Sequence, residues 1–492
     1  MAIKLIYKDL PLGSTEDAAI TTGNYESFST PDILPYGVSS GAVATLERNS
    51  WGLSSDIKAR NNQPFAFWSK AISDKNGIFA TPPIITIDFT EQYTATGLSF
   101  RFSPGVNEYC NKVNVEWWQN GAIKESGDFF PTSAAYVVEN TVEAFDKIVV
   151  KLISTNLPER RAKLEALLIG VIREIDGKEL ISSQYINEID LISNTVPINV
   201  LDAEFHNRSN ADLIFQKKQP VEAYDKGELV GVYYVETGER TGENNYNFSC
   251  QDAIGILDKD TYSGGLWLKD VLAEDVLNDI ISGAFEIELA EALKGSTIRG
   301  YMPECTKREA LQQVAFALGA VIDTSGTEKI KLFLPPTGEG AEIPPTETYI
   351  GGKVTTSDTV TEVLVYGYDI EDKRPSEPWH KYIEIDDVQY KYSLIAASAI
   401  NPNVSAGELT NKIEYKECYL INSSNAQTRA DAILAYYMRR NIYNASHIVH
   451  GQKVSDRARI SLPWGGMQSG NILKMQVVTS GITVSNTDFL LD

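Results

Sequence analysis

The chain has 492 residues and a formal net charge of −22 at pH 7, because 66 Asp and Glu outweigh 44 Lys and Arg. This length predicts about three or four domains. Hydrophobic residues make up 43 % and charged residues 22 %, which are values of globular rather than disordered chains. The acidic total argues against a specific nucleic-acid binder and against docking on anionic lipid. Glycans, neutral ligands and other proteins remain as partner classes.

The N-terminus MAIKLIYKDLPLG lacks the long apolar core of a signal peptide, and no apolar run is long enough for a membrane helix. We therefore expect synthesis in a cytoplasm, without classical secretion. The four cysteines, Cys110, Cys250, Cys305 and Cys418, form no CxxC pair. They predict neither a zinc site nor a disulfide framework, but four reduced and buried thiols.

The first part of the chain reads as β-structure. Segment 84–102, IITIDFTEQYTATGLSFRF, alternates apolar and polar residues on both sides of a polar break. Val113–Trp117 and Ile148–Ile153 are similar strands, and Ala166–Ile172 is a longer apolar run. This spacing predicts a β-sandwich.

A polar junction at 173–183 precedes a second set of short strands. Pro197–Phe205, Val221–Tyr224, Gly231–Val235 and Tyr246–Cys250 alternate with polar turns, which is typical of a small β-barrel. Strands resume at Val354, continue through Val363–Tyr366, and return over 445–492. The fold class is therefore mainly β, with minor α.

Three helices are expected. Leu268–Ile281 has helical spacing and ends at Gly283. Thr306 and Glu309 form a capping box before a helix that Gly319 ends. The third helix, 425–440, starts with Ser424 and Gln427 in capping-box spacing. Segment 335–348 reads as a linker or long loop.

No catalytic constellation is visible in the sequence, and no cofactor or metal is expected. His447 and His450 lie in a strand-like HIVH segment, where residues three apart face opposite sides of a sheet. The acidic stretch between Asp270 and Glu291 is interpreted as a solvated face rather than a catalytic cleft. Asp386-Asp387 lacks the companion oxygens of a calcium loop. We expect a protein that is not an enzyme.

Aromatic residues suggest a binding site in the sandwich. The candidates for carbohydrate stacking are Trp51, Trp68 and Trp118. In a strand, Trp117 and Trp118 face opposite sides, so one of them tends outward. The alternative is that Trp117 belongs to the core and Trp118 to an assembly interface, and we favour it slightly.

Several segments, in order, resemble phage tail-tip or baseplate hub proteins of viruses of Gram-positive bacteria. The first group resembles the discoidin-like jelly-roll sandwich that precedes the hub: AVATLERNSWGL (Ala42–Leu53), FWSKAISDKNGIFATPPIITIDF (Phe67–Phe89) and RRAKLEALLIGVI (Arg160–Ile172). The second group resembles the hub itself: PINVLDAEFHNRSN (Pro197–Asn210), FQKKQPVEAYDKGELVGVYYVE (Phe215–Glu236), FSCQDAIGILD (Phe248–Asp258) and REALQQVAFALGAVIDT (Arg308–Thr324).

The resemblance implies five regions. They are an N-terminal extension (1–39), a discoidin-like sandwich (40–175), a first hub β-barrel (176–265), an α+β insert with two helices (266–340) and a second hub barrel region with one helix (341–492). It also implies a homotrimeric ring in the virion tail. That ring contacts the tail tube, the spike and other baseplate proteins and serves host attachment. A particle of the phage-tail-like bacteriocin type would use the same subunit.

Two other functions stay open. Residues 40–172 could bind host cell-wall carbohydrate. The third hypothesis is a wall-degrading enzyme, because two carboxylates suffice for glycoside hydrolysis. If the ring forms, acidic residues on its lumen would repel DNA. No downstream lytic domain is expected.

Overall fold

The computed structural model describes residues 3–10, 12–23, 25–27, 29–35, 41–43, 47, 60–63, 66–102, 107–208, 213–385, 387–405, 410–480 and 482–492. The chain divides into two compact units. The N-terminal unit comprises Ile6–Glu174 and Arg208–Pro220, and the main unit comprises Met1–Leu5, Ile175–Asn207 and Val221–Asp492.

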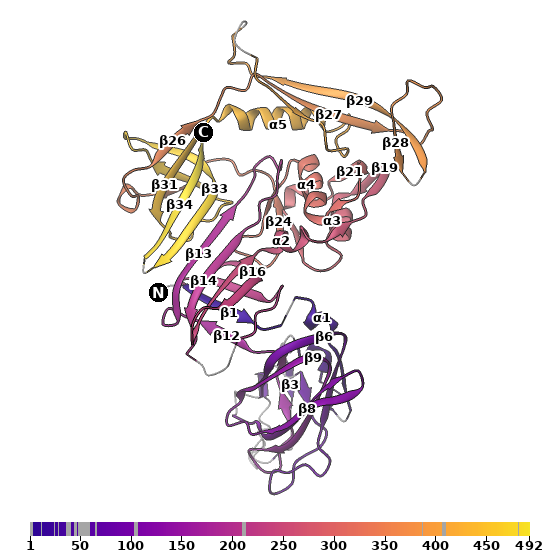
Figure 1. Cartoon of the computed structure of the whole chain (residues 1–492), viewed down its shortest axis with the longest axis vertical. Coiled ribbons are helices and arrows are strands. Elements are labelled where there is room, and N and C mark those ends of the chain that lie inside the picture. Colours follow the sequence, from indigo (N-terminus) through magenta and orange to yellow (C-terminus); the bar gives the residue numbers. More distant parts are fainter. Residues whose placement is uncertain are drawn as a thin grey trace. The chain divides into compact units, whose positions relative to one another are not determined.

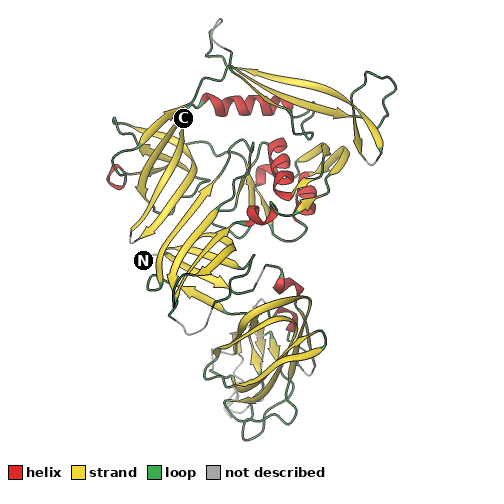
Figure 2. Ribbon diagram, viewed as in Figure 1, coloured by secondary structure: helices red, strands yellow, loops and turns green. Residues whose placement is uncertain are grey.

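Strands dominate both units, so the mainly β fold class is confirmed (Figure 2). The finer division into five domains stays a prediction. No helix in the described ranges is long and apolar enough to cross a membrane.

The N-terminal unit is built on an antiparallel sheet with the strand order β11-β6-β9-β7-β8, and β2 adds to β6 (Figure 1). Its strands are β2 (Ala19–Thr22), β6 (Ile84–Arg101), β7 (Cys110–Gln119), β8 (Ala122–Phe129), β9 (Ala135–Thr155) and β11 (Ala166–Ile169). Two short pairs accompany it: β3 (Gly41–Val43) with β4 (Arg60–Gln63), and β5 (Phe67–Trp68) with β10 (Lys163–Leu164). The short helices α1 (Ser14–Asp17) and η1 (Pro31–Ile33) complete the unit, and β1 (Ile3–Lys8) and β12 (Ile172–Ile175) cross its boundary.

The polar break expected inside segment 84–102 does not end a strand. β6 continues through it, and its pairing with β9 shifts register between Asp88 and Gly97 instead. Such irregularities bend a long strand, so that both of its halves bury an apolar face. Ile85, Ile87, Leu98 and Phe100 accordingly belong to one buried cluster.

The main unit holds a second large sheet. Its strands follow the order β15-β16-β17-β14-β13-β33-β34-β31-β26, so the pairing of β13 with β33 joins early strands to C-terminal ones. The bounds are β13 (Leu180–Glu188), β14 (Val200–His206), β15 (Pro220–Asp225), β16 (Glu228–Arg240), β17 (Asn245–Gln251), β26 (Lys353–Thr356), β31 (Asn441–Ile448), β33 (Met467–Ser480) and β34 (Ile482–Leu491). β32 (Arg457–Ser461) pairs with β33 and with β25 (Ala341–Ile343).

Local chemistry explains the turns between these strands. The turn expected at Asp225-Lys226-Gly227 joins β15 to β16, and both Lys226 and Gly227 have positive φ, of 50° and 89°. Two successive left-handed residues are the signature of the tight hairpin turn that matches strand twist. Segment 335–348, expected to be a loop, contains β25 and a short helix η4 (Pro345–Glu347).

Four smaller sheets and the helices make up the rest of the described main unit. A four-stranded sheet has the order β28-β29-β27-β30 and packs on α5. Its strands are β27 (Glu362–Ile370), β28 (Tyr382–Ile385), β29 (Val388–Ile400) and β30 (Lys412–Tyr415). The others are β18 (Thr261–Tyr262) with β22 (Cys305–Thr306), β19 (Gly265–Leu272) with β21 (Thr297–Met302), and β20 (Ile287–Leu289), β23 (Val321–Asp323) and β24 (Ile330–Phe333) together.

One expected helix start and one expected helix cap are wrong. The helix expected from Leu268 begins only at α3 (Ala273–Ile281), because residues 265–272 form β19 and pair with β21. α5 (Ala426–Met438) has Asn425 as its N-cap without a side-chain cap, and Ser424 instead donates to Asn422. Between them, α4 (Lys307–Leu318) shows the expected capping box of Thr306 and Glu309 and ends at Gly319, with φ of 71°. The short α2 (Ala253–Leu257) and η3 (Glu291–Leu293) were not expected.

Candidate functional site

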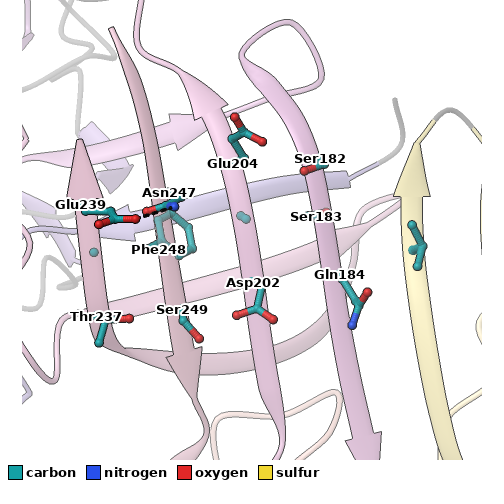
Figure 3. Close-up of a pocket in the computed structure, with 13 residues that line it drawn as sticks. Ser182, Ser183, Gln184, Asp202, Glu204, Thr237, Glu239, Asn247, Phe248 and Ser249 are labelled. Carbon is teal, nitrogen blue, oxygen red and sulfur yellow. Dashed lines mark hydrogen bonds between the residues drawn. The ribbon is translucent and has the colours of Figure 1, made fainter. Parts of the chain in front are cut away.

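A polar face on the large sheet of the main unit is the best-formed candidate surface. Four neighbouring strands, β16, β17, β14 and β13, present a hollow of about 640 Å³ (Figure 3). We call it the acidic face. Its lining comprises Ser182, Ser183, Gln184, Asp202, Ala203, Glu204, Thr237, Gly238, Glu239, Asn247, Phe248, Ser249 and Val478.

The strand register places the polar side chains of this face in two rows. Ser182 pairs with Glu204, Glu204 with Asn247, and Asn247 with Glu239. The next row is Gln184, Asp202, Ser249 and Thr237. Since side chains alternate along a strand, Leu201, Phe205 and Cys250 point to the opposite side of the sheet, where they are buried.

The charge of the acidic face has one sign. Three of its lining residues are carboxylic acids, Asp202, Glu204 and Glu239, and its lining contains no Lys, Arg or His. The Asn247 amide donates to Glu239 at 3.1 Å, so one carboxylate is held along the sheet (Figure 3). A one-signed surface repels anions such as phosphate and attracts cations, which is a binding property rather than a catalytic one.

The cysteines offer no activated nucleophile. Cys110, Cys250 and Cys418 are buried, and Cys305 is partly buried. Burial raises the pKa of Cys305 to about 11 and that of Cys418 to about 12, and raises the pKa of Cys110 and Cys250 as well. A thiol with a raised pKa carries almost no thiolate at neutral pH. No group of three or more His, Cys, Asp or Glu in the described ranges has metal-site geometry.

The two histidines of HIVH face different environments. His447 is fully buried on β31, where its Nε2 lies 3.0 Å from Thr487 Oγ1, and burial lowers its pKa. His450 lies beyond the end of β31 and its Nε2 is 3.2 Å from Glu347. The strand interpretation therefore holds for His447 only, because β31 ends at Ile448.

The acidic stretch that the sequence assigned to a solvated face is exposed. Its seven carboxylic acids all point to solvent: Asp270, Glu274, Asp275, Asp279, Glu286, Glu288 and Glu291. The buried side of α3 is formed by Val276, Leu277 and Ile280. Asp387 is exposed in a turn with φ of 63°, and Asp386 lies outside the described residues.

Of the three tryptophans proposed for carbohydrate binding, the structure describes Trp68 and Trp118. Trp51 lies outside the described residues. Trp68 is 1 % exposed, and the Lys163 Nζ lies 5.0 Å from its ring centre, so its ring face is already covered. Trp118 is partly exposed on β7, whereas its neighbour Trp117 is buried in the core.

The surroundings of Trp68 form a buried charge cluster that sequence reasoning missed. Lys163 pairs with Glu47 at 2.8 Å and with Glu108, and Glu108 pairs with Arg160 at 3.1 Å. All four charged side chains are almost fully buried. They come from distant segments, so no local spacing could have revealed them. The acidic face, in contrast, was indicated by the sequence. The segments Asp202–Glu204 (DAE) and Asn247–Ser249 (NFS) alternate polar and apolar residues at period two, as strands with one polar face do.

Comparison with known proteins gives structural similarity only. No protein-family model matches the sequence, and no curated protein matches it. The structural neighbours are tail proteins. A tail protein from Neisseria meningitidis is 11 % identical, with a TM-score of 0.47 over 66 % of this chain and 94 % of that one. A prophage tail protein from Shewanella oneidensis is 10 % identical, with a TM-score of 0.45 over 65 % and 95 %. A prophage tail protein from Listeria monocytogenes is 10 % identical, with a TM-score of 0.42 over 64 % and 91 %.

Proposed function

We propose that this chain is a structural subunit of a phage or phage-tail-like particle, in the hub at the end of the tail tube. Three copies would form a ring that carries the spike or receptor-binding components during host attachment. The expected location is the virion tail.

One observation carries this proposal. The segments in which the sequence resembles hub proteins contain β14 and β15 and parts of β16 and β17, and these four strands are consecutive neighbours in one sheet. A fourth segment, Arg308–Thr324, contains most of α4, with its Gly319 cap, and β23. The resemblance therefore falls on one connected piece of structure rather than on scattered elements.

The continuity of the sheet supports a load-bearing role. β13 pairs with β33 over six residues, from Ser183–Thr479 to Glu188–Lys474. Backbone pairing of this kind links the early strands to the C-terminal ones directly, without a flexible linker. A subunit that transmits force along a tail needs such a connection.

The acidic face supports a position next to DNA. In a ring, Asp202, Glu204 and Glu239 would lie along the lumen and prevent the genome from adhering to its wall. Analytical ultracentrifugation of the purified chain tests the ring. We expect a trimer. A chain that stays monomeric and is absent from purified tails would contradict the proposal.

A second candidate function is carbohydrate binding by the N-terminal unit. Trp118 is partly exposed, and Gln119 and Asn120, which follow it in sequence, form a hydrogen-bonded group of amides with Gln92. An aromatic ring next to amide groups suits a sugar, because the ring stacks on C–H bonds while amides bond hydroxyls. Isothermal titration with host wall polysaccharide tests this, and unchanged affinity in Trp118→Ala would count against it.

The third candidate function is degradation of the cell wall. A zymogram on host peptidoglycan tests it. We expect no clearing, and clearing that disappears after mutation of one carboxylate would overturn the structural assignment.

A further inference from the structure

A large cleft of the main unit is lined by arginines, although the chain as a whole is strongly acidic. Its volume is about 1000 Å³, and its walls come from α5, β21, the end of α4 and segment 334–338. Four arginines line it: Arg299, Arg429, Arg439 and Arg457. The acids in its lining are Asp270 and Asp492. We call it the arginine cleft.

One end of the arginine cleft already holds a carboxylate. The Asp492 side chain lies between Arg439, whose Nη1 is 3.6 Å from Oδ1, and Arg457, whose Nη2 donates to Oδ2. Arg457 also donates to Asn471 at 2.9 Å, which fixes its guanidinium. At this end a single carboxylate of the chain therefore compensates part of the charge of two arginines.

The other end lacks such a partner. Arg429 is 4 % exposed, and no ion pair with it occurs in the described part of the chain. Its Nη2 donates to the Ile192 carbonyl at 3.0 Å, its guanidinium carbon lies 4.8 Å from the Phe316 ring centre, and its buried Nε has no hydrogen-bond partner in the structure as described. Burial lowers the pKa of Arg429 to about 10, so it stays charged at neutral pH.

The compensation of this charge is partial. A Cβ atom on Gly319 would lie 2.7 Å from the Arg429 Nη1, which places the guanidinium at the C-terminal end of α4. That end carries roughly half a negative charge. Arg299 adds a second cation, whose contacts with Asn422 and Asp369 are long, at 3.5 and 3.6 Å. An incompletely paired buried charge is costly, and its presence requires a reason.

The rest of the lining matches a polypeptide better than a small anion. The amides of Asn422 and Asn425 are bonded within the chain, whereas Thr428 is exposed in the lining and its hydroxyl group can bond a peptide backbone. The apolar lining consists of Leu191, Ile192, Leu318, Leu334, Pro335, Pro336, Ala432 and Ala435. A single phosphate would fill only a small part of this volume, whereas clefts of this size enclose several groups of a ligand.

We propose that the arginine cleft binds an extended peptide segment that contains acidic and apolar residues, with a carboxylate directed at Arg299 and Arg429. Its donor is a neighbouring protein of the particle, and this identification of the donor rests on the proposed function. The Asp492 carboxylate between two arginines is the same interaction made within the chain.

Fluorescence anisotropy of the full chain with a labelled Glu-Leu-Ser-Glu-Leu-Ser peptide tests the site. We expect saturable binding that weakens at least about tenfold, roughly 1.4 kcal/mol, when both Glu are replaced by Gln. Arg299→Gln and Arg429→Met should each weaken binding by a similar factor. Met has a comparable volume and no charge to bury, so the thermal midpoint of Arg429→Met should not fall.

Two exposed positions on α5 provide the matched control. Ala432 lines the cleft, whereas its neighbour Asp431 does not. Ala432→Trp should block the peptide by volume, and Asp431→Trp should leave its affinity unchanged. Absence of saturable binding, equal binding by Ala432→Trp, or complete displacement by equimolar phosphate would each overturn the proposal. These measurements use the isolated chain, so they fail or succeed independently of whether the chain is found in a tail.

Discussion

The Lys163 Nζ lies 5.0 Å from the centre of the Trp68 ring, in the interior of the N-terminal unit. The same ammonium is paired with Glu47 and Glu108. Trp68 is thus part of a buried cation–π and ion-pair arrangement, which gives it a structural role that its sequence position did not indicate.

Removal of the Trp68 ring should therefore affect stability and not sugar binding. We expect Trp68→Ala to lower the free energy of unfolding by about 3–5 kcal/mol, since it empties a large buried site. Urea unfolding measures this. Trp118→Ala, at a partly exposed position, is the control and should cost much less. A stable Trp68→Ala variant with weakened polysaccharide binding would contradict this role.

Breaking the charge cluster should be more costly than breaking a surface ion pair. Glu108→Gln leaves Lys163 and Arg160 buried with reduced compensation, and we expect a loss of about 3–5 kcal/mol of unfolding free energy. Asp88→Asn, which breaks the exposed pair of Asp88 with Lys147 at 2.8 Å, is the matched control. Similar urea midpoints for the two variants would show that the buried cluster adds nothing.

Asp252 should make the main unit less stable as pH rises. Its Oδ2 accepts from Thr324 at 2.6 Å and its Oδ1 from the Gly255 amide at 3.2 Å, but burial dominates and raises its pKa from 3.8 to about 6. The folded state thus binds the proton more tightly than the unfolded state. The stabilisation of the folded state by this proton, roughly 3 kcal/mol, is fully present below pH 3.8. It is lost as pH rises through about 6.

Asp252→Asn removes this titration. The unfolding free energy of the variant minus that of the parent should increase by roughly 3 kcal/mol between about pH 4 and pH 7, as measured by urea unfolding. A difference that is independent of pH would mean that Asp252 ionises normally in the folded chain.

The acidic face should matter for passage of DNA. In a DNA-filled particle, replacing Asp202, Glu204 and Glu239 together by Lys should slow genome ejection at least about tenfold, because phosphates would adhere to the wall. Replacing Glu274, Asp275 and Glu288, which are exposed on and beside α3, changes the net charge equally and should leave ejection unchanged. Equal effects of the two triple variants would exclude a lumenal position for the acidic face.

Strong local signals allowed much of the fold to be predicted. The Thr306–Glu309 capping box fixed the start of α4, and the Asp225-Lys226-Gly227 turn fixed the β15–β16 hairpin. The prediction of the start of α3 was wrong because the residues before Ala273 have helical spacing but belong to β19, which pairs with β21. Tertiary pairing overrides local periodicity in such segments.

The sites were less predictable than the fold. The Trp117–Trp118 alternation correctly assigned Trp117 to the core, but nothing near Trp68 in sequence announced Lys163. The arginine cleft combines residues from β21, α5 and β32. Arg299 and Arg429, for example, are more than a hundred residues apart in the sequence. Only the folded chain brings such residues together.

A cryo-EM reconstruction of the intact tail tip is the decisive experiment for the proposed hub ring. We expect three copies of this chain in a ring at the end of the tail tube, with Asp202, Glu204 and Glu239 turned toward the lumen. A tail tip that lacks the chain, or a ring in which this acidic face points outward, would contradict it.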